Sequence, residues 1–250
     1  MIDRDKFFAG VKIALFSKGY STGEVDGIND ILDAWDKYGD KDERKLGYLF
    51  ATDYHETAFH MEGIDEIGKG AGHAYGQPAG PFHLIYFGRG APQMTWYANY
   101  VRADDKAHNI GLFKPEESLV KTPELANRRD VSAWLLIAGA MDGWWTGHKL
   151  GDYFNATKSD PVGARRVING TDKADLIAGY YRTFLNTLVN ASVLDAPPVG
   201  ATPQPQVPVP APVDASKPQT APKPLPAAPM GLLAFIIKLI SMFFTRKAKP

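Results

Sequence analysis

The sequence has no cysteine in its 250 residues, and its basic and acidic residues are equal in number. Disulfide bridges, thiolate metal sites and a cysteine nucleophile are therefore excluded. Alternating patterns typical of strands are scarce and no internal repeat is visible, whereas apolar residues recur often at helical spacing. These absences favour a mainly α-helical globular protein that side-chain packing holds together.

The N-terminus lacks the basic start of a secretion signal. Asp3 and Asp5 are acidic, and Phe7, Val11 and Leu15 recur at the spacing of an amphipathic helix. We therefore predict an ordinary first helix and a protein made in the cytoplasm without a signal peptide. If the protein acts outside the cytoplasm, another factor has to release it.

The composition changes near residue 190. Residues 1–190 have a globular composition and are numerous enough for one hydrophobic domain. Residues 191–229 hold most of the 19 prolines, which predicts an extended, semi-rigid linker. The globular part carries a small excess of acidic side chains, which argues against nucleic acid as a partner.

Residues 230–250 form an apolar run followed directly by basic residues. As a helix, residues 230–244 would be about 22 Å long, shorter than the ~30 Å hydrocarbon core of a bilayer. Arg246, Lys247 and Lys249 follow, and their charge suits an anionic surface. We predict a membrane-active helix that contacts a lipid membrane; a helix that docks on another protein is the alternative.

Helical periodicity and glycine content give a coarse map of the globular part. Residues 131–141 are apolar all round but too few to span a bilayer, so they predict a buried central helix. Residues 62–92 are rich in glycine and predict loops or short irregular strands. Residues 27–30 are typical of a turn that leads into a helix. Further helices are predicted at residues 46–54, 92–103, 123–127, 160–167 and 172–189.

Carboxylates gather after the apolar pattern that ends near residue 56. Glu56 adjoins His55 and several aromatic rings, and partial burial there would raise its pKa toward the range of a general acid. A second carboxylate could come from Glu62, Asp65 or Glu66, and spacing alone does not choose among them. Two carboxylates of this kind are what hydrolysis of a glycosidic bond requires.

Other chemistries find less support in the sequence. His55 and His60 are five residues apart, so one helix face does not offer both to a zinc ion, and we predict no metal site. The Gly68-x-Gly70-x-Gly72 run does not follow an apolar strand as a phosphate-binding loop would. No G-x-S-x-G motif is present, which leaves a serine hydrolase without positive support.

Neutral polar side chains and aromatic rings follow the glycine-rich segment. Gln93, Thr95 and Asn99 offer two amides and a hydroxyl, which can hold sugar hydroxyls or a water molecule. Tyr86 and Trp96 belong to a set of aromatic residues that could stack on sugar faces, although such residues are more often part of a core. The combination favours a sugar polymer as the substrate.

The segments YHETAF, EIGKG, YFGRGAPQMTWYANY and ARRVINGTDKADLIAGYY follow one another in this order. In these segments the chain resembles glycoside hydrolase family 19, the chitinase-like enzymes, and within it the bacteriophage and prophage endolysin branch. The resemblance covers roughly residues 25–188. Its most specific motifs, as a pair, are G-R-G-x-x-Q-x-T-W-x-x-N-Y and R-R-x-I-N-G-x-D.

The resemblance implies a lysozyme-like, mainly α fold of two lobes with a cleft. It implies inverting hydrolysis of β-1,4 bonds next to N-acetylglucosamine, without a cofactor. By position, Glu56 matches the general acid, and Glu66 fits the second carboxylate best, with Glu62 as the fallback. Thr95 matches the residue that holds the attacking water.

The resemblance also implies substrate contacts. Gln93, Asn99 and Asn169 match substrate-binding amides. We add Tyr86 and Trp96 as further substrate contacts because of their rings. His55 is expected to orient or pack beside Glu56, and we count it among the substrate-binding residues as well. Arg89, in the Gly-Arg-Gly turn, is expected to have a structural role that links the lobes.

One departure stands beside these matches, since the family often has Gly-Gly where this chain has Ala58-Phe59. The implied function is that of an endolysin, a monomer that cleaves peptidoglycan glycan strands in the periplasm and lyses the bacterial host. A chitinase is the runner-up among enzymes. A non-catalytic glycan-binding module and a secreted antibacterial toxin are further alternatives.

Overall fold

A computed structural model describes residues 2–192, and residues 193–250, with the predicted apolar helix and almost all of the predicted linker, lie outside the described residues. The α-helices of the described part are α1 (Arg4–Ala14), α2 (Thr22–Tyr38), α3 (Glu43–Glu56), α4 (Tyr97–Asn109), α5 (Arg129–Asp142) and α6 (Ala174–Ala191). Its 3-10 helices are η1 (Ala74–Gly76), η2 (Pro123–Asn127), η3 (Leu150–Asp152) and η4 (Gly163–Val167). The expected mainly α-helical class is confirmed. None of these helices is long and apolar enough to cross a membrane.

Side-chain caps explain where the first three helices begin. Asp3 and Asp42 accept hydrogen bonds from backbone N–H groups of the first turns of α1 and α3. Ser21 and Glu24 form a reciprocal capping box at the start of α2. Each cap satisfies a donor that the helix itself leaves without a partner. These local signals fix helix starts before any tertiary contact is made.

The predicted turn at residues 27–30 is wrong, because these residues lie inside α2. A Cβ atom at Gly27 would lie 1.7 Å from the carbonyl oxygen of Met61. The glycine therefore serves close packing of α2 against the segment that follows α3, and no turn is needed there. Helix interiors tolerate glycine at a cost of about 1 kcal/mol, which this contact offsets.

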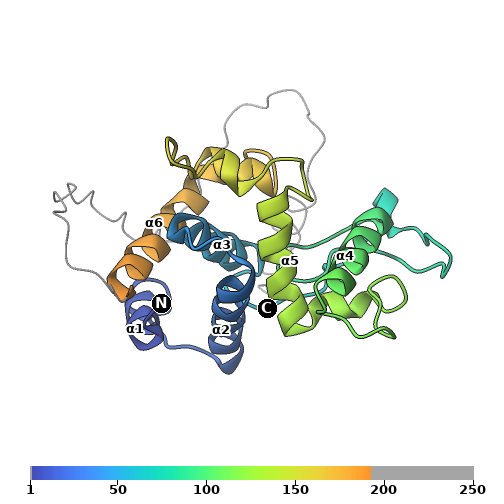
Figure 1. Ribbon diagram of the computed structural model, residues 1–250, viewed down its shortest axis with the longest axis horizontal. Helices are drawn as coiled ribbons and strands as arrows, with labels where there is room; N and C mark the ends of the chain where they lie inside the picture. The colour runs from blue at the N-terminus through green and yellow to red at the C-terminus, as the bar shows by residue number, and fades with distance from the viewer. Residues whose placement is uncertain (1, 193–250) are drawn as a thin grey trace, which may run out of the picture. The chain divides into compact units, whose positions relative to one another are not determined.

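Helix α5 lies between two hydrophobic cores. Its residues Leu136 and Ile137 belong to the core built mainly from α1, α2, α3 and α6. Its residues Trp134 and Leu135 belong to the core built around α4 and the segment before it. Figure 1 shows α5 with α2 and α3 on one side and α4 on the other. Contact with both cores explains why this helix is apolar all round, as the prediction of a buried central helix required.

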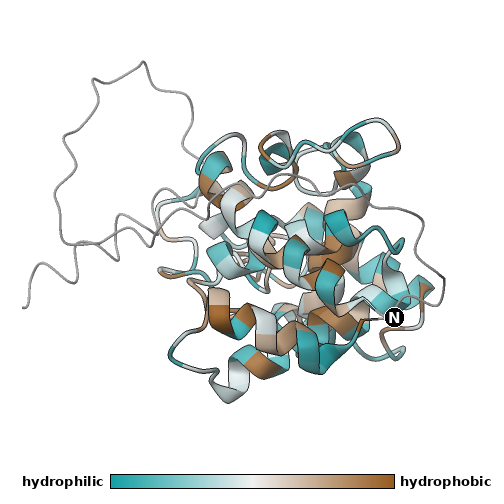
Figure 2. Cartoon of the chain, turned by 90° about the vertical axis from the view of Figure 1, so that its left-hand side faces the viewer, coloured by the Kyte–Doolittle hydropathy of each residue, from teal (hydrophilic) through white to brown (hydrophobic). Residues whose placement is uncertain are grey.

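Helix α3 carries the first carboxylate and is the most enclosed helix of the first core, packing along α6. Phe50 of α3 contacts Phe7 of α1 and stacks on Phe184 of α6, with ring centroids 5.2 and 5.4 Å apart. Hydrophilic and hydrophobic residues are interspersed along the helices (Figure 2), as amphipathic helices around a shared core require. These ring contacts pack the middle of α3 between α1 and α6.

The segment between α3 and α4 contains no regular strand, only turns, η1 and isolated bridges such as that between Arg89 and Met94. This confirms the predicted loop character. The helix predicted at residues 92–103 is displaced to Tyr97–Asn109, because Gln93 and Trp96 adopt left-handed backbone angles, with φ of 52° and 71°. The helix predicted at residues 160–167 is shorter, a 3-10 turn over Gly163–Val167.

Candidate active site

Glu56 is the last residue of α3 and is buried. One of its carboxylate oxygens accepts a hydrogen bond from the guanidinium of Arg165, at 2.6 Å, and Arg165 is completely buried in η4. Burial raises the pKa of Glu56, while the charge of Arg165 and its hydrogen bond act in the opposite direction. Burial therefore favours the protonated form of Glu56, and Arg165 favours its ionised form.

Arg165 is itself oriented by the backbone around it. Its Nε donates to the carbonyl oxygen of Asp172 at 2.8 Å, and its own carbonyl oxygen accepts from the N–H of Asn169 at 2.9 Å. The backbone of Asn169, a predicted substrate-binding residue, thus contacts Arg165, which is the partner of Glu56. His55 is half-buried there, and burial, together with Arg165, lowers its pKa to about 4. His55 is therefore neutral near pH 7.

Glu66 lies in the loop that follows and is also buried. Its carboxylate accepts one hydrogen bond from the backbone N–H of Gly88, at 2.9 Å, and another from the hydroxyl of Tyr75, at 3.0 Å. Burial, then the adjacent Glu66, raises the pKa of Tyr75, so its hydroxyl remains a donor. Two neutral donors hold the two oxygens of Glu66 in fixed positions.

Gln93 lies beside Glu66. A Cβ atom at Gly88 would lie 2.9 Å from Oε1 of Gln93 and 3.2 Å from Cβ of Glu66, so both side chains flank this glycine. The amide nitrogen of Gln93 donates to the carbonyl oxygens of Ile64 and Gly90, at 2.8 and 3.1 Å. Its amide oxygen is buried without a hydrogen-bond partner. A buried acceptor of this kind is available to a hydroxyl of a bound molecule.

Thr95, Trp96 and Asn99 form the start of α4 and the turn before it. The side-chain amide of Asn99 donates to the carbonyl oxygen of Thr95 at 2.9 Å, and both residues are half-buried. Trp96 is 50% exposed and meets Tyr75 edge to face, with ring centroids 5.6 Å apart. An exposed ring therefore adjoins the residue that holds Glu66, where it can stack on a sugar.

Tyr86, predicted to contact substrate, is a core residue instead. It is 1% exposed, and its hydroxyl donates to the carbonyl oxygen of Val120 at 2.8 Å. Its ring packs on those of Tyr97 and Tyr100 in the second core. This correction follows from tertiary packing, because an apolar ring in a glycine-rich segment has the same sequence signal whether it faces a core or a cleft.

The other acidic candidates lie elsewhere. Glu62 is exposed and lies against α2, where a Cβ at Gly23 would clash with its carboxylate. Asp65 accepts a hydrogen bond from Asn127 at 2.6 Å and lies 3.7 Å from Nε of Arg89. Glu66 is therefore the buried one of the three. Arg89 is buried, with its guanidinium over the ring of Phe87, consistent with a structural role.

Sequence reasoning missed three residues of this region. Arg165 and Tyr75 bind the two carboxylates, and Asp53 lies one helical turn before Glu56. No spacing rule connects Arg165 to a carboxylate 109 residues away. Asp53 had a local signal, a charged residue inside an otherwise apolar helical stripe. Within residues 2–192, no group of three or more His, Asp or Glu side chains could hold a metal ion.

Comparisons with known proteins add a structural likeness. No family model matches the chain, and no curated protein matches it. A solved structure described as a bacterial family 19 chitinase that differs from plant enzymes is similar, with a TM-score of 0.43 and 19% sequence identity. The similarity covers 72% of this chain and 93% of the other. A likeness of this degree does not by itself assign the chain to that family.

Proposed function

We propose that this protein is a glycoside hydrolase that cleaves β-1,4 bonds of bacterial peptidoglycan by inversion, with Glu56 as general acid. The observation that carries the proposal is a pair of buried carboxylates in contrasting surroundings, Glu56 beside a buried cation and Glu66 between neutral donors. Glycosidases divide the work of acid and base between two such carboxylates.

The first step is proton transfer to the glycosidic oxygen. Burial raises the pKa of Glu56, which increases the fraction that carries a proton near neutral pH. Once the proton has left, the new carboxylate lies 2.6 Å from the guanidinium of Arg165. That charge stabilises the product of the transfer, so Arg165 makes Glu56 a stronger acid at the moment of bond cleavage.

The second carboxylate serves the attacking water. An inverting pair requires roughly 6.5–9.5 Å between its carboxyl groups, which leaves space for that water, and we expect this separation between Glu56 and Glu66. Glu66 accepts the proton of the water, and the hydroxyl of Thr95 helps to position it. Gln93, Asn99 and Asn169 hold the sugar, and Trp96 stacks on it.

Peptidoglycan is favoured over chitin by two features of the sequence. The motifs around Glu56 and Asn169 resemble the endolysin branch, and an apolar segment followed by basic residues ends the chain. An endolysin of this kind would act on peptidoglycan in the periplasm during host lysis. A tail that contacts lipid would hold it at an anionic membrane.

The test is mass analysis of the fragments released from purified peptidoglycan, with chitin oligomers treated in parallel. Wild type and a Glu116→Gln control, which changes an exposed glutamate far from the site in sequence, should release muropeptides cut at a glycosidic bond. Glu56→Gln should release almost none. Cleavage of chitin alone would establish a chitinase, and cleavage of neither substrate would favour a glycan-binding module.

A further inference from the structure

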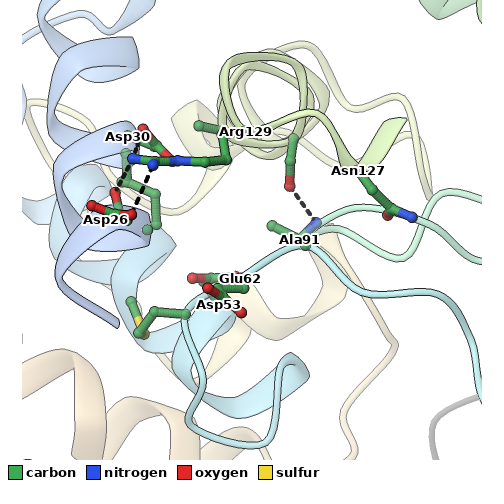
Figure 3. A pocket seen from close by; sticks show the side chains of 13 residues that line it. Asp26, Asp30, Asp53, Glu62, Ala91, Asn127 and Arg129 are labelled. Carbon is green, nitrogen blue, oxygen red and sulfur yellow. Dashed lines mark hydrogen bonds and ion pairs between the residues drawn. The ribbon is translucent and has the colours of Figure 1, made fainter. Parts of the chain in front are cut away.

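A pocket of about 250 Å³ lies between α2, α3 and α5, and the segment after α3 forms part of its wall. None of the proposed catalytic side chains lines it. Figure 3 shows Arg129 on one wall, joined to Asp26 and Asp30, and also labels Asp53 and Glu62 among the lining residues. The pocket is smaller than those that take drug-sized ligands, so it suits a single side chain rather than a disaccharide.

The charges of the pocket do not balance. Arg129 forms ion pairs with Asp26 at 2.8 Å and Asp30 at 2.5 Å, so these three groups largely satisfy one another. Asp53 and Glu62 form no ion pair among the described residues. One cation therefore faces four carboxyl groups, and two of these, Asp53 and Glu62, have no cation paired with them in the part of the chain that the structure describes.

Asp53 is the unusual member of this set. It is completely buried, and neither of its carboxyl oxygens has a hydrogen-bond partner. A buried carboxyl whose two oxygens have no hydrogen-bond partner lowers the free energy of unfolding. Burial, then the adjacent Glu56, raises the pKa of Asp53 to about 8. Because Asp53 lines a pocket, a ligand bound there could supply the hydrogen-bond partner that its carboxyl lacks.

The walls of the pocket indicate which cation fits. A metal ion is disfavoured, because no group of three or more acidic or histidine side chains converges within residues 2–192. Ile31, Met61 and Ala133 give the pocket apolar surface. An alkyl chain can lie along such surface while its charged end meets a carboxylate. These features suit an organic cation with a hydrocarbon stem.

We propose that this pocket binds a primary alkylammonium group, the side-chain amine of a diamino acid in the peptide stems of the glycan substrate. The inference rests on the proposed function. Asp53 lies one helical turn before Glu56, and Glu62 lies four residues before Glu66, so the pocket adjoins both carboxylate segments. A stem held there would fix which sugar of the strand reaches Glu56, and chitin would lack this contact.

The pH dependence of amine binding has a definite sign. Asp53 has to lose its proton to pair with an ammonium group, so affinity should increase as pH rises toward about 8 and a proton should be released. Affinity should fall again when the amine itself loses its charge, near pH 10. Glu56 interacts electrostatically with Asp53, and the charged groups Glu62, Asp26, Asp30 and Arg129 line the same pocket.

The experiment is calorimetric titration of the full chain with Nα-acetyl-lysine amide, and with the same compound acetylated on its side-chain amine. The free amine should bind wild type, and the acetylated compound should not. Asp53→Asn should weaken its binding about tenfold or more, as expected for a hydrogen bond to a charged group. Asp105→Asn, which changes an exposed aspartate of α4, is the matched control and should bind as wild type does.

Three results would overturn the proposal: no binding of the amine, equal binding of the acetylated compound, or unchanged affinity in Asp53→Asn. The thermal stability of each variant shows whether a loss of binding reflects unfolding. Hydrolysis of glycan strands freed of their peptide stems, measured separately, tests the proposed function alone. If these strands are cut but no amine binds, the pocket inference fails and the glycosidase stands.

Discussion

The two buried carboxylates are held in opposite ways. Glu56 is the last residue of α3 and faces the positive charge of Arg165. Glu66 lies in an irregular loop, and the donors that fix it, Gly88 and Tyr75, are neutral. The charge of Arg165 favours the ionised form of Glu56, whereas the two neutral donors fix the positions of both oxygens of Glu66. The contrast fits an acid that must change its protonation state and a base that must be aimed.

Replacing each carboxylate should give the largest effect and separate the two roles. We expect Glu56→Gln to lower kcat about 10²–10⁴-fold on natural substrate, the range of general acid catalysis. On an aryl glycoside whose leaving group needs no protonation, Glu56→Gln should recover most of its activity and Glu66→Gln should not. Initial rates on both substrates measure this, and recovery by Glu66→Gln instead would exchange the two roles.

Removing the positive charge of Arg165 beside Glu56 should have the next largest effect. Arg165→Gln should raise the pKa of Glu56, so the alkaline limb of the kcat/KM profile should move to higher pH. Breaking a buried ion pair should also lower the free energy of unfolding by about 3–5 kcal/mol. Arg166→Gln, at the exposed neighbouring position, is the control. An unmoved alkaline limb in a folded Arg165→Gln protein would contradict Glu56 as the acid.

Asp53 gives a stability effect that depends on pH. Its pKa in the folded protein is about 8, above the ordinary value near 3.9 of an unfolded chain. The folded state therefore binds this proton more tightly, so its contribution to stability is full below pH 4 and is lost as pH rises to 8. Asp53→Asn should gain stability relative to wild type across that window, by on the order of a few kcal/mol. Melting temperatures at pH 4, 6 and 8 should diverge steadily.

The smallest expected effect concerns Ala58 and Phe59, which stand where the chitinase-like enzymes often have Gly-Gly. Both residues adopt left-handed backbone angles, with φ of 50° and 76°, a region that glycine enters at no steric cost. Ala58 is exposed, so Ala58→Gly should relieve strain and stabilise the fold by about 1 kcal/mol. Phe59 packs on the rings of Tyr54 and Tyr180, so Phe59→Gly should destabilise it. Chemical denaturation measures both, and a loss of stability in Ala58→Gly would refute the strain argument.

Most helices followed from local signals, but not all their limits. The buried helix predicted at residues 131–141 corresponds to α5, and the pattern of residues 46–54 corresponds to α3. The start of α4 was missed because left-handed angles at Gln93 and Trp96 have no reliable signature in residues other than glycine. The turn predicted at Gly27 was wrong because glycine allows close packing of a helix as readily as it allows a turn.

The candidate site was also only partly predictable from the sequence. Glu56 and Glu66 could be selected from the sequence, through their motifs and their resemblance to known enzymes. The burial of Tyr86 and the contacts of Glu62 with α2 could not, because they depend on which side of a loop faces a core. The unpartnered carboxyl of Asp53 was likewise visible only once α2, α3 and α5 enclosed it.

By itself the sequence determined a mainly helical domain without disulfides, the capped starts of α1, α2 and α3, and the residue types of a two-carboxylate site. These properties depend on neighbours within a few residues along the chain. Only the tertiary structure decided that Arg165 pairs with Glu56, that Tyr75 and Gly88 hold Glu66, and that Asp53 has no partner. The pKa of a carboxyl depends on its burial and on charges a few ångströms away, and folding brings those charges from distant parts of the chain.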